Sequence, residues 1–253
     1  MEEDAVTPDA MQVSAGTAVI WDFDETLAQR PGRWTGCLRE VLDELAPGHG
    51  IQESAIAAHL KTGFPWHSPW RSHPELSSPA EWWKTVEELL ANAFQRLGVA
   101  QTRARDFAMR AHERYADGEV SWQTYPDAEP ALDRLARAGV PQFMLSNHVP
   151  ELPSIVDSLG LHGYFERIFT SAAIGFEKPH PESYGTAIRA IGPARSTWMI
   201  GDNPEADCRG AERRGIKGIL LRREPHDERT PAAIERCASD LRQAVAMILD
   251  PTT

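Results

Sequence analysis

The chain has 253 residues, of which 37 are Asp or Glu and 26 are Lys or Arg, so its formal net charge is −11. This acidic balance argues against a nucleic-acid-binding protein, because such proteins neutralise phosphates with a concentrated basic surface. Hydrophobic residues make up 42% and charged residues 25% of the chain, proportions typical of a globular protein with one large or two modest domains.

No segment approaches the ~18 consecutive apolar residues that a membrane helix needs, and the acidic start of the chain does not resemble a targeting peptide. The three cysteines, Cys37, Cys208 and Cys237, lie far apart and lack the C-x-x-C spacing of zinc or redox sites. We therefore expect free thiols in a cytoplasmic protein without a membrane partner, with Cys208 in the core.

The first half of the chain predicts a flexible tail at 1–15, one buried strand at 17–23 and then a helical region. The strand is an apolar run bounded by Gly16 and an acidic cluster, a pattern that favours a central parallel strand. From residue 30 to residue 118 we find helical periodicity and no convincing strand. Helices are predicted at 38–45, 54–60, 80–97 and 102–115.

The second half alternates short apolar runs with helical patterns. Strands are predicted at 140–146, 167–170, 197–201 and 216–221, and helices at 127–138, 151–159, 181–191 and 204–214. Each of these helices is followed by a glycine, which suits a left-handed C-terminal cap. Right-handed βαβ units then predict an α/β fold with a doubly wound, Rossmann-like parallel sheet. We expect a core domain at 16–29 and 119–253, interrupted by an α-helical cap domain at 30–118.

Polar residues stand where the predicted strands end, and ligands of such sheets bind beyond the carboxyl ends of the strands. The residues concerned are Asp22 and Asp24, Ser146 and Asn147, Asp202 and Asp207, together with Lys178 just before the helix at 181–191. Clustered Asp oxygens suit a hard divalent cation such as Mg²⁺.

These motifs resemble those of the haloacid dehalogenase-like (HAD) superfamily, in particular its phosphatase branch with a helical cap inserted after the first motif. The resemblance rests on Asp22-x-Asp24-x-Thr26, Ser146 at a strand end, Lys178-Pro179 and Gly201-Asp202-x-x-x-x-Asp207, in that order. Phosphoglycolate-phosphatase-like enzymes are the nearest general resemblance.

The resemblance implies a role for each acidic residue. Asp22 and Asp202 would bind Mg²⁺ through their carboxylates and Asp24 through its backbone carbonyl, while Asp22 would attack phosphorus and form an aspartyl phosphate. Asp24 would act as general acid and then as general base, so its pKa should lie well above the ordinary value of about 3.9. Asp207 would orient Lys178 or a metal-bound water through a hydrogen bond without binding the metal itself.

The resemblance also implies which residues bind the phosphoryl group. Lys178 would neutralise its charge, while the hydroxyl of Ser146 and nearby backbone N–H groups would donate hydrogen bonds to its oxygens. Asn147, next in sequence, is a candidate for a further phosphate contact through its side chain or backbone. His148, next in sequence, is as well suited to contacting substrate as to capping a turn.

Four tryptophans fall within eighteen residues of the predicted cap, at 66, 70, 82 and 83. We expect Trp82 and Trp83 to fill the core of the cap. Whether the remaining tryptophans, His67, Arg71 and His73 contact the substrate stays open.

We therefore expect a Mg²⁺-dependent phosphatase that hydrolyses a small phosphorylated metabolite and is a monomer or homodimer. Phosphomutase and phosphonatase activities on the same scaffold remain alternatives, as do a 2-haloacid dehalogenase and a non-catalytic binding protein. Dehalogenases of this family generally lack the second aspartate, so Asp24 argues against that activity. The only lysines in the predicted cap that might serve a phosphonatase are Lys61 and Lys84.

Overall fold

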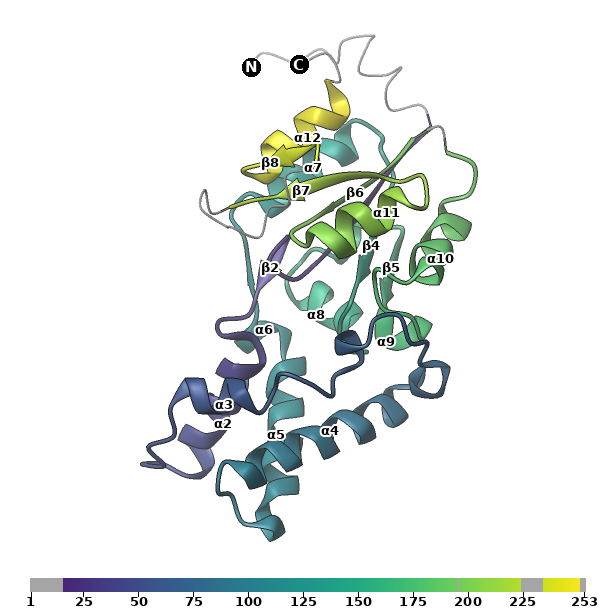
Figure 1. The fold of residues 1–253 in the computed structure, drawn as a ribbon. Helices are drawn as coiled ribbons and strands as arrows, with labels where there is room; N and C mark the ends of the chain where they lie inside the picture. The colour runs from purple at the N-terminus through teal and green to yellow at the C-terminus, as the bar shows by residue number, and fades with distance from the viewer. Residues whose placement is uncertain (1–15, 195, 224–233, 251–253) are drawn as a thin grey trace.

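The structure is a parallel β-sheet covered by helices on both faces, with a helical insert at one end of the sheet (Figure 1). The computed structural model describes residues 16–194, 196–223 and 234–250, so the tail expected at 1–15 lies outside the described residues. Six strands pair in the order β5-β4-β1-β6-β7-β8, all parallel. They are β1 (Thr17–Trp21), β4 (Gln142–Ser146), β5 (Arg167–Thr170), β6 (Ser196–Gly201), β7 (Lys217–Leu221) and β8 (Cys237–Ala238).

The central strand β1 is buried along its whole length because both faces of the sheet are covered. Its side chains alternate between two hydrophobic clusters: Val19 and Trp21 belong to one, Ala18 and Ile20 to the other. Since both faces are apolar, the strand reads in the sequence as a continuous hydrophobic run rather than as an alternating pattern.

Each face of the sheet has its own set of helices. The cluster that contains Trp21 takes in α7 (Ala128–Arg137), α8 (Leu152–Ser158) and α12 (Leu241–Leu249), and the opposite cluster takes in α10 (Pro181–Ile191) and α11 (Gly210–Glu212). The short helix α9 (Ser171–Ile174) follows β5. This arrangement confirms the predicted doubly wound α/β fold.

The helical insert, which we define as residues 33–121, lies between the paired strands β2 (Ala28–Gln29) and β3 (Gln123–Thr124). Its helices are α2 (Arg33–Leu45), α3 (Glu53–Ala58), α4 (Pro79–Arg96), α5 (Gln101–Ala116) and α6 (Gly118–Ser121). Figure 1 shows α2 to α5 gathered below the sheet. Because β2 and β3 are short and antiparallel, the chain leaves the sheet and returns to it at one narrow connection.

The longest helix of the insert has one apolar face, which packs into the hydrophobic core of the insert. Helix α4 begins where the Ser78 hydroxyl accepts the N–H of Glu81, with Pro79 in the first turn. Trp82, Val86, Leu90 and Phe94 recur every four residues and are all buried. The ring of Phe94 packs edge-on against Phe107 of α5 at 5.3 Å.

The predicted elements agree with the structure except at a few points. The five predicted strands and most helices are present, with ends that differ by a few residues. The first helix of the insert starts at Arg33, five residues before the predicted 38, and β2, β3, β8 and α12 were not expected. The helix predicted over 204–214 is wrong as one α-helix: residues Pro204–Arg209 form a π-helical turn that leads into α11.

Within the described residues, no helix is long and apolar enough to cross a membrane. All three cysteines are free, and Cys208 is fully buried, as expected for a core residue.

Candidate active site

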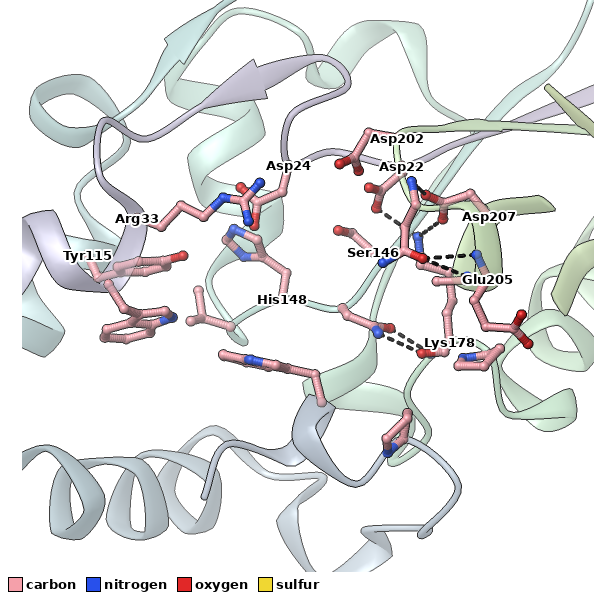
Figure 2. A pocket seen from close by; sticks show the side chains of 18 residues that line it. Asp22, Asp24, Arg33, Tyr115, Ser146, His148, Lys178, Asp202, Glu205 and Asp207 are labelled. Carbon is pink, nitrogen blue, oxygen red and sulfur yellow. Dashed lines mark hydrogen bonds and ion pairs between the residues drawn. The ribbon is translucent and has the colours of Figure 1, made fainter. Parts of the chain in front are cut away.

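The carboxyl ends of β1, β4 and β6 open into a cavity of about 390 Å³ that the helical insert covers from the other side. Strand order reverses at β1, which has β4 on one side and β6 on the other, and this is where ligands of open α/β sheets bind. All seven site residues expected from the sequence line this cavity: Asp22, Asp24, Ser146, Asn147, Lys178, Asp202 and Asp207 (Figure 2).

A buried lysine stands between two of the carboxylates. The Lys178 ammonium lies 2.7 Å from Asp22 Oδ1 and 2.6 Å from Asp207 Oδ1, and its side chain is only 3% exposed. Burial alone would lower the pKa of Lys178, but Asp207 and Asp22 raise it above its ordinary value, so the ammonium stays charged.

Asn147 fixes the backbone of this lysine. Its amide donates to the Lys178 carbonyl at 2.8 Å, and its side-chain oxygen accepts the Lys178 N–H at 2.6 Å. Asn147 therefore ties the end of β4 to the lysine loop, because its side-chain amide offers both a donor and an acceptor.

Asp207 has hydrogen-bond donors on both of its oxygens. Oδ1 accepts from Lys178, and Oδ2 accepts the backbone N–H of Asn203 at 2.9 Å. The carboxylate lies against Gly201 at the end of β6, where a Cβ atom would overlap it. Burial raises the pKa of Asp207 to about 6, although Lys178 opposes this shift.

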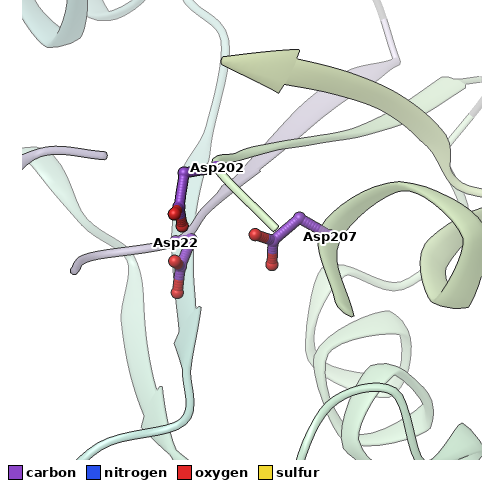
Figure 3. Close-up of side chains that lie close together, drawn as sticks. All are labelled: Asp22, Asp202 and Asp207. Atoms are coloured by element: carbon purple, nitrogen blue, oxygen red, sulfur yellow. The ribbon is translucent and has the colours of Figure 1, made fainter. Parts of the chain in front are cut away.

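Three carboxylates converge at this point without enough positive charge to balance them. Oxygens of Asp22, Asp202 and Asp207 all lie within 4.8 Å of one another (Figure 3). Since Asp207 already has two donors and no described residue donates to the Asp202 side chain, the oxygens left for a cation are those of Asp22 and Asp202. An all-oxygen set of this kind fits a hard divalent cation such as Mg²⁺.

The protonation equilibria of the site reflect the same excess of negative charge. Burial, and after it the charge of Asp22, raises the pKa of Asp202 to about 7. A bound cation relieves this repulsion and keeps the carboxylate ionised.

Asp24 follows Asp22 by two residues and lies in a tight turn closed by backbone bonds from Leu27 and Ala28 to Phe23. Burial, and then the charge of Asp22, raises the pKa of Asp24 well above its ordinary value. A raised pKa favours the protonated carboxyl, which is the state that a general acid requires.

Two polar side chains from β4 and the residues after it face the cavity without a hydrogen-bond partner among the described residues. The hydroxyl of Ser146 is buried and unpaired, as are both ring nitrogens of His148. Because buried polar groups are normally satisfied, these atoms are available to a ligand.

The helical insert supplies several cavity residues, most of which sequence reasoning missed. These are Arg33 and Trp34 at the start of α2, Trp66 and Pro69 in the loop before α4, and Tyr115 near the end of α5. Tyr115 stacks on Trp34 with ring centres 3.7 Å apart. Only the tryptophan-rich loop gave a signal in the sequence, because α2 was expected to start after Arg33 and Tyr115 has the period of a helix core.

The residues of the loop before α4 lie differently with respect to the cavity. Trp66 lines the cavity, whereas His67 and Arg71 are exposed and do not. His73 is buried and does not line the cavity. Its backbone N–H donates to the carbonyl of Gly175, after α9, at 2.7 Å, and this contact anchors the loop. Trp82 and Trp83 are buried in the core of the insert, as expected.

Residues 17–215 match the model of the haloacid dehalogenase-like hydrolase family. The phosphoserine phosphatase of Thermus thermophilus is 29% identical over 247 residues, which cover 89% of this chain and 96% of that protein. Haloacid dehalogenase-like hydrolase domain-containing protein 3 of Mus musculus is 29% identical over 214 residues, or 80% of each chain.

Solved structures share the fold at lower identity. A 2-haloacid dehalogenase from Pseudomonas syringae superposes with a TM-score of 0.67 at 21% identity and covers 94% of this chain and all of that one. The HAD hydrolase YfnB from Bacillus subtilis, crystallised with magnesium, has a TM-score of 0.66 at 16% identity, with 92% of this chain and 99% of that chain covered. At these identities the likeness extends to the fold alone.

The contact between Gly201 and Asp207 generates a prediction. Gly201→Ala places a methyl group where the Asp207 carboxylate lies, so we expect a loss of about 1–3 kcal/mol in the free energy of unfolding. Urea denaturation measures it. The control is Gly163→Ala, where a Cβ meets no atom within 4 Å. Equal stability of the two variants would contradict the packing described here.

Proposed function

This chain belongs to the haloacid dehalogenase-like hydrolase family, and we propose that it is a magnesium-dependent phosphatase of small phosphorylated metabolites. The observation that carries the proposal is the cluster of Asp22, Asp202 and Asp207 around the single ammonium of Lys178 in a small covered cavity. The names of relatives, phosphoserine phosphatase and glyceraldehyde 3-phosphate phosphatase among them, support the same reaction class.

Asp22 and Asp202 would hold the Mg²⁺ ion, together with the backbone carbonyl of Asp24. When bound, the ion offsets the charge of the carboxylates and of the phosphate ester, so that the two anions approach each other. Asp207 does not compete for it, because both of its oxygens are engaged by Lys178 and Asn203.

The remaining residues of the cavity position and balance the phosphoryl group. Asp22 attacks phosphorus and forms an aspartyl phosphate, which water then hydrolyses. Lys178 contacts Asp22 directly, so it also lies within reach of the group that Asp22 attacks and offsets its charge. The unpaired hydroxyl of Ser146 donates to a phosphoryl oxygen, and Asn147 holds Lys178 in place.

Asp24 transfers the proton in both steps. It protonates the leaving alcohol when Asp22 attacks, and as a carboxylate it then takes a proton from the water that cleaves the aspartyl phosphate. Its raised pKa supports the first role, since the acid must carry a proton at the outset.

The helical insert acts as a cap over this chemistry. It covers the cavity with aromatic side chains, including Trp34, Trp66 and Tyr115, and excludes water from the phosphoryl transfer. The narrow β2–β3 connection is where such a cap would move relative to the sheet.

The alternatives fit the site less well. A 2-haloacid dehalogenase needs neither a cation nor a general acid, whereas this cavity has both the carboxylate cluster and Asp24. A phosphonatase needs a lysine free to form a Schiff base. Among the described cavity residues the only lysine is Lys178, which is paired with two carboxylates, and both Lys61 and Lys84 are exposed outside the cavity.

A phosphomutase and a binding protein on the same fold would differ from a phosphatase in what happens to the phosphoryl group. A mutase would return the phosphoryl group to a turned substrate instead of releasing it to water, and a binding protein would not form the aspartyl phosphate at all. Measurement of inorganic phosphate release and of the phosphorylated enzyme separates these three functions.

The nucleophile assignment predicts that Asp22→Asn abolishes catalysis. We expect Mg²⁺-dependent hydrolysis of p-nitrophenyl phosphate to fall by at least about 10³-fold, since an amide neither attacks phosphorus nor binds the cation as well. Acid-quenched wild-type enzyme should carry one phosphoryl group on Asp22 by mass spectrometry, and the variant none. The exposed Asp157→Asn serves as control and should retain full activity. Hydrolysis by Asp22→Asn at the wild-type rate would refute the assignment.

The acid/base assignment predicts that Asp24→Asn slows both half-reactions by about 10²–10⁴-fold with an alkyl phosphate such as glycerol 2-phosphate. Rapid-quench measurements report the rates at which the phosphoenzyme forms and decays. Formation should be less affected with p-nitrophenyl phosphate, because nitrophenolate leaves without a proton. Mg²⁺ affinity should change little, as the ion would use the backbone carbonyl. Unchanged rates of both steps would rule out this role for Asp24.

A further inference from the structure

The cavity has two chemically different sides. Figure 2 shows Lys178, Asp207 and Glu205 on one side and Arg33, Tyr115 and His148 on the other, next to Asp24. Since Asp24 is the acid that protonates the leaving alcohol under the proposed function, the side with Arg33, Tyr115 and His148 is where the leaving group lies. The residues on that side therefore decide which alcohols fit.

His148 is the least expected of these residues. Its side chain is buried, and the centre of its ring lies 5.4 Å from that of Phe23 and 5.0 Å from that of Trp122. Neither ring nitrogen has a hydrogen-bond partner among the described residues. Burial lowers the pKa of His148 to about 4, so near neutral pH the ring is uncharged. An uncharged imidazole carries one N–H, and leaving it buried without an acceptor is unfavourable. A bound substrate removes that penalty.

Tyr115 offers a second unpaired donor on the same side. Its ring lies 6.1 Å from that of His148 and is held by the stack on Trp34. The side chain is 3% exposed, and no described residue forms a hydrogen bond with its hydroxyl. A phenol held rigidly by stacking loses little conformational freedom when it binds a ligand.

Arg33 adds positive charge to these two donors. Its Nε lies 3.2 Å from Glu25, which in turn accepts a hydrogen bond from the Tyr125 hydroxyl at 2.9 Å. This chain of contacts orients the guanidinium at the edge of the cavity. A guanidinium has five N–H donors, so the contact with Glu25 leaves others for a ligand.

We propose that His148, Tyr115 and Arg33 form a leaving-group subsite that binds a carboxylate of the substrate, so that the enzyme selects small phosphomonoesters of carboxylate-bearing alcohols. This inference rests on the proposed phosphatase function and narrows its substrate class. A carboxylate accepts hydrogen bonds only, which matches two neutral donors and one cation converging from one side. The cavity volume of about 390 Å³ must also hold the phosphoryl group, which restricts the leaving group to a few carbon atoms.

Two pairs of substrates test the inference because the members of each pair differ in a carboxylate. The pairs are O-phospho-L-serine with O-phosphoethanolamine, and 2-phosphoglycolate with ethyl phosphate. We expect the wild-type enzyme with Mg²⁺ to prefer the carboxylate member of each pair by at least about tenfold in kcat/KM, the size expected for hydrogen bonds to a charged group.

Two variants assign this preference to the subsite. His148→Phe keeps the ring packing and removes the N–H, and Tyr115→Phe removes only the hydroxyl. Each should lower kcat/KM for the carboxylate-bearing esters by about tenfold or more, mainly through KM, and change kcat/KM for the two esters without a carboxylate by less than about threefold. Tyr115→Phe is the more conservative change and decides the question if His148→Phe does not fold.

Matched controls come from residues outside the cavity. His112→Phe replaces a histidine whose ring stacks on that of Trp83 with centres 3.5 Å apart. Tyr164→Phe removes a hydroxyl that faces Glu129. Both should keep the wild-type preference. Equal loss for both members of a pair in His148→Phe and Tyr115→Phe, or no preference in the wild type, would overturn the subsite while leaving the phosphatase function intact. No hydrolysis of any of the four esters by folded wild-type enzyme would overturn both.

Discussion

The arrangement of the site depends on the crowding of negative charge at the carboxyl ends of β1 and β6. Asp22, Asp202 and Asp207 bring their oxygens within 4.8 Å of one another, and among the described residues the only ammonium beside them belongs to Lys178. One positive charge does not balance three carboxylates away from bulk water, because burial strengthens their repulsion. We propose that a divalent cation held by Asp22 and Asp202 removes the imbalance.

The surrounding structure holds this unfavourable cluster in place from several sides. Gly201 leaves room for the Asp207 carboxylate, and Asn203 donates its backbone N–H to it. Asn147 fixes the lysine loop from β4. On the insert side, the indole of Trp83 donates to both carboxylate oxygens of Glu151 at the start of α8, at 2.9 Å and 3.0 Å. In this conformation the insert is thus tied to the sheet region, with Trp34, Trp66 and Tyr115 lining the same cavity as the carboxylates.

The sheet and most of the polar site could be predicted from the sequence for one physical reason. A parallel strand buried on both faces is a continuous apolar run, and the residue that follows it must lie at the ligand-binding edge. The positions of Asp22, Ser146 and Asp202 at that edge can therefore be predicted from the strand that precedes each of them. The same holds for helix ends marked by glycine, such as α10 before Gly192.

The contribution of the insert could not be predicted in the same way. Arg33 and Tyr115 reach the cavity only because α2 and α5 pack side by side, and that packing depends on contacts between distant segments such as the stack of Trp34 on Tyr115. The π-helical turn Pro204–Arg209 was missed although its hydrogen bonds to Asn203 and Asp207 are local, because the hydrophobic pattern of so few residues does not distinguish a π-helical turn from an α-helix. The absence of a partner for His148 is likewise a property of the assembled core.

The claim that Asp22 and Asp202 share one cation is tested most directly by the structure of a crystal grown with saturating MgCl₂. We predict one ion with carboxylate oxygens of both Asp22 and Asp202 at about 2.0–2.1 Å, and Asp207 still paired with Lys178. Well-ordered Asp22 and Asp202 side chains that point apart, with no shared ion between them, would contradict the account.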